Sequence, residues 1–128
     1  MANEKITPTA AELEILQLLW QHGPLTVRRV CDALNEDRKL GYTTVLKTMQ
    51  IMHDKGMLGR ELDGKRHIYH AKIAETDTQD RLLDVFLQRT FGGSTKRLVM
   101  RALGNYKTSS ADLEDLKRLI DGLEQEEE

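Results

Sequence analysis

Hydrogen-bonding side chains gather on one side of a helix predicted between Gly41 and Gly56. At about 100° per residue, the apolar and polar side chains of this stretch separate onto opposite sides of the helix. Its polar side holds Thr43, Lys47, Gln50 and Asp54, with Thr44 next to the first of them. A plain surface helix would carry long charged residues there, whereas hydroxyl, amide and ammonium groups can bond to another molecule. We therefore predict that this side of the helix recognises another molecule through hydrogen bonds.

The sequence offers no comparable set of residues for catalysis or for a metal. It contains no glycine-rich phosphate loop, no nucleophile motif and no paired carboxylates in a plausible pocket context, so we expect neither an enzyme nor a cofactor. His67 and His70 are three apart on a predicted strand and would point to opposite faces, and the other two histidines lie in other elements. We therefore expect no metal site. The single cysteine, Cys31, excludes an internal disulfide.

Composition and charge indicate which partner such a surface would meet. The 128 residues can form one core or two small lobes, and no apolar run approaches the roughly 18 residues of a membrane span. With no signal peptide at the N-terminus, we expect a cytoplasmic protein that does not insert into a membrane. The net charge of −2 divides into +1 over residues 1–71 and −3 over 72–128, and the segment Arg38 to Arg66 carries seven basic and three acidic residues. Positive charge thus surrounds the helix described above.

Three helices and a hairpin are expected in the first lobe. Two threonines provide N-cap signals, one of them in a capping-box pattern, and Gly or Gly-Pro marks the ends. The expected caps and ends are, in chain order, Thr9 with Glu12, Gly23-Pro24, Thr26, the polar run Asn35 to Lys39, Tyr42 or Thr43, and Gly56. The strand and turn signals that follow are Leu58, Arg60 and Leu62, then Asp63-Gly64, then His67 to Ala71.

This order of elements is typical of a winged helix-turn-helix. In that arrangement the third helix projects into the DNA major groove and the hairpin lies along the DNA backbone. The fold class predicted is mainly α with a small β-hairpin. We expect a winged helix DNA-binding domain over residues 1–72, followed by a three-helix dimerisation lobe over 76–124 and an acidic frayed tail over 125–128.

The predicted second lobe is rich in leucine but short. Thr76 with Gln79 repeats the capping-box pattern, Gly92-Gly93 end a first helix, and Ser109 with Asp112 caps the last helix. Three short helices cannot bury so many apolar side chains alone, so we expect a homodimer that completes its core against a second copy. The dimer interface is predicted at Leu82, Phe86, Leu113, Leu116, Ile120 and Leu123.

Helix geometry assigns a role to each candidate DNA contact. Thr43 and Thr44, at the helix N-terminus, can bind a phosphate or a base edge. Lys47 can donate to guanine and Gln50 matches the edge of adenine. Leu46 and Ile51 either meet thymine methyl groups or pack against the hairpin. The predicted phosphate contacts are Thr26, Arg28, Arg60, Lys65 and Arg66.

The chain also resembles the penicillinase-repressor family of the BlaI/MecI type. The resemblance rests on spaced signposts that cover nearly the whole chain. These are Ala11 to Leu16 with Leu19-Trp20, Gly23 to Val27, Tyr42 to Val45, Lys55-Gly56 and the arginine-rich hairpin. It implies a homodimeric transcriptional repressor that binds a palindromic operator overlapping a promoter in double-stranded DNA, with a TACA/TGTA dyad in the antibiotic-resistance members.

The same resemblance implies how the repressor would be released. In those members a membrane sensor metallopeptidase initiates induction and the repressor is cleaved within its dimerisation lobe, at a bond matched here by Arg101-Ala102. The copper-responsive relatives carry paired cysteines near the C-terminus, which this chain lacks. Ile51 replaces an arginine, and Gly41-Tyr42 replaces a Ser-Pro start, which implies a different operator half-site.

A function of another class is compatible with the same elements. Winged helices also serve as protein-interaction modules without sequence-specific DNA binding, and a first lobe of +1 is less basic than many DNA-binding domains. The placement of charge discriminates the two, because the basic residues cluster around the third helix and the hairpin. That placement favours DNA.

Overall fold

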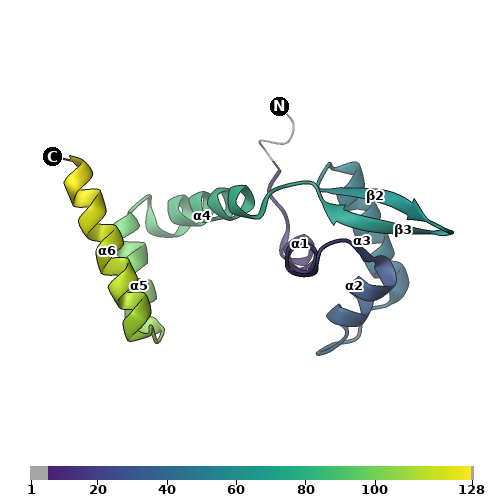
Figure 1. Cartoon of the computed structure of the whole chain (residues 1–128), viewed down its shortest axis with the longest axis horizontal. Helices are drawn as coiled ribbons and strands as arrows, with labels where there is room; N and C mark the ends of the chain where they lie inside the picture. Colours follow the sequence, from purple (N-terminus) through teal and green to yellow (C-terminus); the bar gives the residue numbers. More distant parts are fainter. Residues whose placement is uncertain (1–5, 128) are drawn as a thin grey trace. The chain divides into compact units, whose positions relative to one another are not determined.

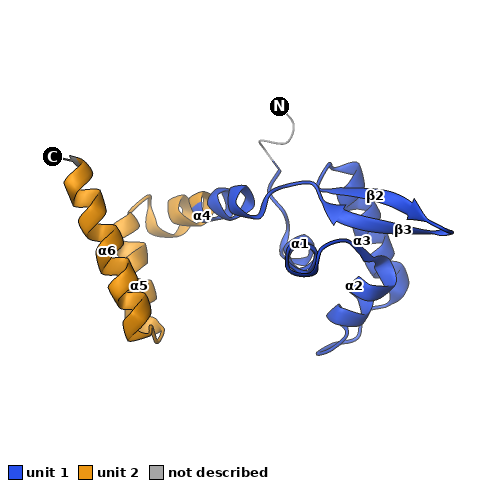
Figure 2. Ribbon diagram, viewed as in Figure 1, with its two compact units in different colours: residues 1–83 blue, residues 84–128 orange. Residues whose placement is uncertain are grey.

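The computed structural model describes residues 6–127, which form two compact units that divide between Leu83 and Asp84 (Figures 1 and 2). Six helices and three short strands appear in these residues, so the predicted class, mainly α with a small sheet, is confirmed. In chain order they are α1 (Ala10–His22), β1 (Leu25–Thr26), α2 (Val27–Leu34), α3 (Tyr42–Asp54), β2 (Leu58–Asp63), β3 (Arg66–Ala71), α4 (Glu75–Phe91), α5 (Thr95–Asn105) and α6 (Ser110–Glu127).

Local capping chemistry sets the limits of the first two helices as predicted. The Thr9 backbone N–H donates to Glu12 Oε1 at 2.9 Å, and the Glu12 N–H donates to Thr9 Oγ1 at 3.2 Å, which completes a capping box. Gly23 ends α1 with a φ of 82°, which glycine adopts without strain. Thr26 caps α2 by accepting a hydrogen bond from the Arg29 N–H.

The apolar faces of these helices close over the small sheet to form one core. The buried residues are Ile15, Leu16, Leu19, Val27, Val30, Cys31, Leu34, Val45, Met49, Met52, Met57, Leu58 and Tyr69. The side of α3 opposite the predicted recognition side is therefore its core side, which fixes which residues of α3 can reach another molecule.

The sheet contains one strand that the sequence did not predict. Its order is β1-β3-β2, all antiparallel, with β1 pairing Leu25 to Tyr69 of β3. Two residues are too few to show a period of two, so β1 carries no strand signal. The hairpin turn also lies one residue later than expected: Asp63 pairs with Arg66, leaving Gly64 and Lys65 as the turn, with a φ of 68° at Gly64.

Two predicted helix starts are wrong. The N-cap of α3 is Gly41, which provides no side-chain cap, and Tyr42 is already the first helical residue. Helix α4 begins at Glu75, so Thr76 lies inside it rather than capping it, and the Thr78 hydroxyl instead donates to the Ala74 carbonyl. In both cases a backbone turn begins one or two residues before the polar side chain that signalled it.

In the second unit the predicted breaks are confirmed. Gly92 and Gly93 follow α4 with φ values of 58° and 86°, and Ser109 Oγ accepts from the Asp112 N–H to start α6. Two limits differ from the expected domain boundaries. The division between units falls within α4 instead of before it, and α6 continues through residues 125–127, the segment expected to be a frayed tail.

An ion pair ties α3 to the start of α1. Lys55 Nζ lies 3.0 Å from Glu12 Oε2, and the Glu12 side chain is only 5% exposed whereas that of Lys55 is 50% exposed. Burial raises the pKa of the Glu12 carboxyl, but the Thr9 N–H bond and the bond and charge of Lys55 outweigh it, so the pKa is lowered below its usual value.

We expect Glu12→Gln to destabilise the fold by about 1 kcal/mol at pH 7, because glutamine keeps the capping bond but loses the charge. A carboxyl whose folded pKa is lowered stabilises the fold above its unfolded pKa, and this contribution is lost as the pH falls through the folded pKa. The difference between wild type and variant should therefore disappear at acidic pH. Urea unfolding at pH 7 and pH 3 measures it.

Glu14→Gln is the matched control, because the Glu14 carboxylate pairs with Arg38 where both side chains are more than 40% exposed. Glu14→Gln should lower the free energy of unfolding by less than about 0.5 kcal/mol at either pH. A Glu12→Gln difference that persisted unchanged at pH 3 would show that the charge of Glu12 is not what stabilises the fold.

Candidate nucleic-acid interface

A basic groove runs between α2, α3 and the β2–β3 hairpin. Its volume is about 280 Å³, and its wall includes all five predicted phosphate contacts and Gln50. The charged and polar residues that line it are Thr26, Arg28, Gln50, Arg60, Lys65, Arg66 and His67. No carboxylate of the described residues lines this groove, so it presents four cationic side chains to any anion that enters it.

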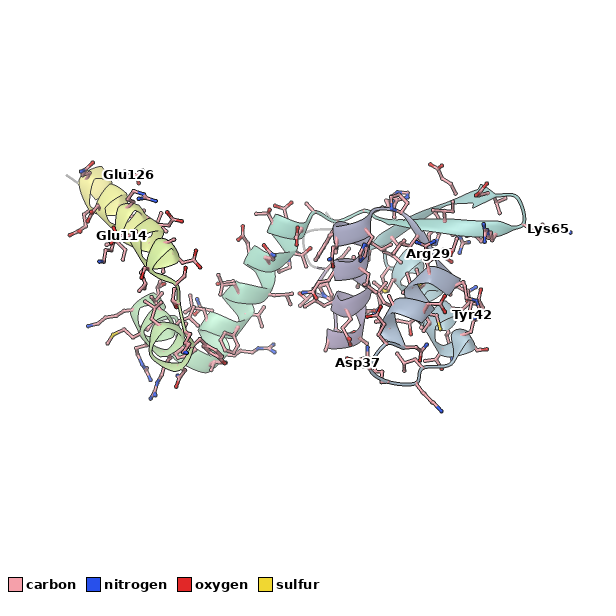
Figure 3. The ribbon with its side chains drawn as sticks, turned by 60° about the horizontal axis from the view of Figure 1, so that its bottom comes forward. Arg29, Asp37, Tyr42, Lys65, Glu114 and Glu126 are labelled. Atoms are coloured by element: carbon pink, nitrogen blue, oxygen red, sulfur yellow. The ribbon has the colours of Figure 1, made fainter. Side chains whose placement is uncertain are left out.

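Three different elements position these cations. Arg28 belongs to the first turn of α2 and Arg60 to β2. Figure 3 shows Lys65 at the tip of the hairpin. The Arg60 guanidinium donates to the hydroxyl of the buried Tyr69 at 3.4 Å, which fixes its stem against the core. The groove is thus formed by residues distant in sequence. Its cationic side chains are spaced so that they can contact successive charges of one continuous anionic chain.

The predicted recognition side of α3 is exposed. Thr43, Thr44, Lys47 and Gln50 all face away from the core, and Ile51 is 41% exposed. Because Gly41 provides no side-chain cap, the first N–H groups of α3 remain open to an external acceptor. Leu46 differs: it is partly buried against the core and lines the groove, which supports the packing interpretation for that residue.

Tyr42 belongs to the site, although the sequence did not predict it there. The Arg28 guanidinium carbon lies 4.6 Å from the centre of the Tyr42 ring, and both residues line the groove. A cation over an aromatic face is attracted to it and loses rotational freedom. Fourteen positions separate the two residues in the chain, so only the packing of α2 against α3 brings them together.

The basic cluster counted along the sequence is partly neutralised. Arg38 and Lys55 form ion pairs with Glu14 and Glu12 of α1, so two of its seven basic residues have carboxylate partners. Arg28, which lies outside that segment, joins the groove instead. Positive charge is therefore more concentrated at the groove than the count of basic residues along the sequence suggests.

The four histidines do not assemble into a metal centre in this structure. His67 lines the groove with its ring 6.2 Å from that of Tyr69, whereas His70 packs over Gly59 on the other face of the sheet. Within residues 6–127 no group of three or more His, Cys, Asp or Glu side chains is placed to hold a metal ion.

A second candidate surface is apolar and lies on the second unit. Of the described side chains between residues 84 and 126, none is buried. The predicted interface residues Phe86, Leu113, Leu116, Ile120 and Leu123 are 37–54% exposed, whereas Leu82, in the first unit, is only partly exposed. Further exposed apolar residues of this unit are Val99, Met100 and Leu103 in α5 and Leu119 in α6.

Comparison with known proteins identifies the family to which this combination of elements belongs. A family model described as penicillinase repressor matches residues 8–122, which is nearly the whole chain. The chain belongs to the penicillinase repressor family. Membership confirms the resemblance drawn from the sequence signposts, and the family is one of transcriptional repressors.

Individual members of the penicillinase repressor family are distant relatives. The penicillinase repressor of Staphylococcus aureus is 19% identical over 96% of this chain and 98% of its own length. That of Bacillus licheniformis is 23% identical over 87% of each chain, and the methicillin resistance regulatory protein MecI of Mammaliicoccus sciuri is 19% identical over 94% and 98%. The similarity therefore spans both units, while most individual side chains differ.

The fold has a solved counterpart outside the family. A MarR family protein from Bacillus stearothermophilus superposes with a TM-score of 0.52 at 19% identity, covering 98% of this chain and 79% of that one. The likeness supports the winged-helix architecture alone. As in the sequence, no helix among the described residues of this penicillinase repressor family member is long and apolar enough to cross a membrane.

Proposed function

We propose that this chain is a homodimeric transcriptional repressor that binds an inverted-repeat operator in promoter DNA. The observation that carries the proposal is the basic groove, which joins four cations to the exposed polar side of α3. The groove and the N-terminus of α3 would hold the phosphate backbone, while Lys47 and Gln50 would reach base edges in the major groove. Ile51 would meet a thymine methyl group beside them.

The dimer in this proposal is supported by the second unit. A unit of this length with no buried side chain between residues 84 and 126 has no closed core of its own. Pairing α4, α5 and α6 with those of a second copy would cover the exposed leucines and phenylalanine. Two winged-helix units in one dimer would then read the two halves of an inverted repeat.

Release would follow from losing that dimer. Arg101 and Ala102 lie in α5 and are exposed, between the apolar residues that the second copy would cover. A cut at this bond by a peptidase acting downstream of a membrane sensor would separate α6 from the rest of the chain and leave the interface incomplete. The operator would then be bound by monomers, with much lower avidity.

Selection from genomic DNA tests the proposal. The purified protein is incubated with sheared DNA of its source organism, and the bound fragments are recovered and sequenced. We expect a dyad-symmetric motif over promoters, with half-site centres about one helical turn apart. If a dimer neutralises about eight phosphates, log K should fall against log salt with a slope near −7. Recovery of unselected DNA, or of none, would favour a protein-interaction module instead.

Within this proposal Tyr42 positions Arg28 on a phosphate. We expect Tyr42→Leu to weaken operator binding about 10-fold, because an exposed cation–π contact contributes about 0.5–1 kcal/mol in each of two protomers. Tyr42→Phe keeps the ring and should bind like wild type. Electrophoretic mobility shifts at one salt concentration measure both variants.

A double-variant cycle separates positioning from direct contact. If Tyr42 acts through Arg28, Tyr42→Leu should cost nothing further in an Arg28→Gln background. Additive losses in that cycle, or a Tyr42→Phe variant as weak as Tyr42→Leu, would instead assign Tyr42 its own contact with DNA through the hydroxyl or ring.

A further inference from the structure

A cavity of about 320 Å³ lies at the start of α4 and shares no lining residue with the basic groove. Three segments form it: Ile6 ahead of α1, the chain leaving β3, and the first turns of α4. All of them belong to the first unit. The side chains that bear on its chemistry are Ile6, Lys72, Ile73, Asp77, Thr78 and Arg81.

The unusual feature of this cavity is the guanidinium of Arg81. Its Nη1 atom is buried, and no group in the described chain accepts a hydrogen bond from it. A buried charged donor without an acceptor destabilises a fold, and such groups are uncommon in native proteins. A hydrogen-bond acceptor that enters the cavity would satisfy this donor.

The surrounding groups favour an anion as that acceptor. Lys72 adds a second cation, and Asp77, one turn before Arg81, forms no ion pair with it within residues 6–127. The buried Thr78 is already occupied, since its hydroxyl donates to the Ala74 carbonyl at 2.8 Å. Ile6 and Ile73 provide an apolar wall beside the two cations.

We propose that this cavity binds a small organic carboxylate. Its charged group would bond to Arg81 and Lys72, and an aliphatic body would lie against Ile6 and Ile73. A guanidinium suits this task because its planar fork matches the two oxygens of a carboxylate. The cavity volume exceeds what a bare inorganic anion needs, which is why an organic anion fits better.

One wall of the cavity is fixed by a contact that does not involve a ligand. The Trp20 indole N–H donates to the Ile73 carbonyl at 3.1 Å, which fixes the chain leaving β3 against α1. A carboxylate bound there would join the segment ahead of α1 to α4, the helix that continues into the second unit. The site is thus placed to report a metabolite to the repressor, although its occupation does not depend on DNA binding.

Hexanoate is the probe that tests the site, titrated by calorimetry into the full-length protein without DNA. We expect saturable binding with a Kd of about 1 mM or tighter, together with a shift of the Arg81 Nε–H resonance in a 15N spectrum. Hexanamide, which lacks the charge, and acetate, which lacks the aliphatic body, should each bind at least about 10-fold more weakly.

Variants show whether Arg81 carries the binding. Arg81→Gln should lower affinity at least about 10-fold and Arg81→Lys by less, while Arg89→Gln, on an exposed part of the same helix, should change nothing. If Arg81→Gln does not fold, the second test of the site is Lys72→Gln, which lies at its exposed end. No heat and no Arg81 shift up to about 10 mM hexanoate would overturn the proposal. So would equal binding of hexanamide, because the affinity would then not depend on the charge of the carboxylate.

Discussion

Replacing Leu116 and Ile120 together by aspartate is expected to convert the proposed dimer into a monomer and to lower operator affinity about 10³-fold. The two side chains are one turn apart on α6 and are 37% and 52% exposed in the single chain. In the dimer they would be covered, so each aspartate would place an unpaired charge in an apolar interface. A monomer would then bind one half-site without the effective concentration that links the second.

Sedimentation at micromolar concentration and mobility shifts on the selected operator measure the two effects. Lys117→Asp is the matched control, because its side chain is 71% exposed on the same helix and the substitution also adds negative charge. It should leave the dimer intact. If the double variant remained a dimer, the predicted interface would be wrong. If it became a monomer with unchanged operator affinity, the predicted role of the dimer in DNA binding would be wrong.

Most of the fold could be predicted because its signals are local. The Thr9–Glu12 capping box, the glycines after α1, α3 and α4, and the apolar spacing of Val45, Met49 and Met52 each act within a few residues. Where a helix could start at more than one neighbouring residue, local signals were not sufficient. Thr76 resembled a cap, yet α4 begins at Glu75, because the backbone of Ala74 and the hydroxyl of Thr78 close an earlier turn.

The sequence proposes residues for the candidate site, but it does not show how they are arranged. Their residue types predict Arg28, Arg60, Lys65 and Arg66 as phosphate contacts, and the structure places all four around one groove. The pairing of Lys55 with Glu12 joins residues 43 positions apart, a relation that no spacing pattern records. The same holds for the stack of Arg28 on Tyr42, which depends on how two helices pack.

Removing two cations from the groove is the other change with a large expected effect. We expect Arg60→Gln with Arg66→Gln to lower operator affinity about 10³-fold, because a dimer would lose four charge-assisted contacts of about 1 kcal/mol each. The salt dependence should change as well. Four fewer phosphates would reduce the slope of log K against log salt from near −7 to about −3.5.

The slope distinguishes groove contacts from a general loss of charge. Arg29→Gln with Arg89→Gln removes the same charge, but neither residue lines the groove, and Arg29 adjoins Arg28 in α2. This control should retain both the affinity and the slope to within about one phosphate contact. Because Arg60 also bonds to Tyr69, urea unfolding must first show that the groove variant keeps its stability. A stable variant that lost affinity with an unchanged slope would place the phosphate backbone elsewhere on the unit.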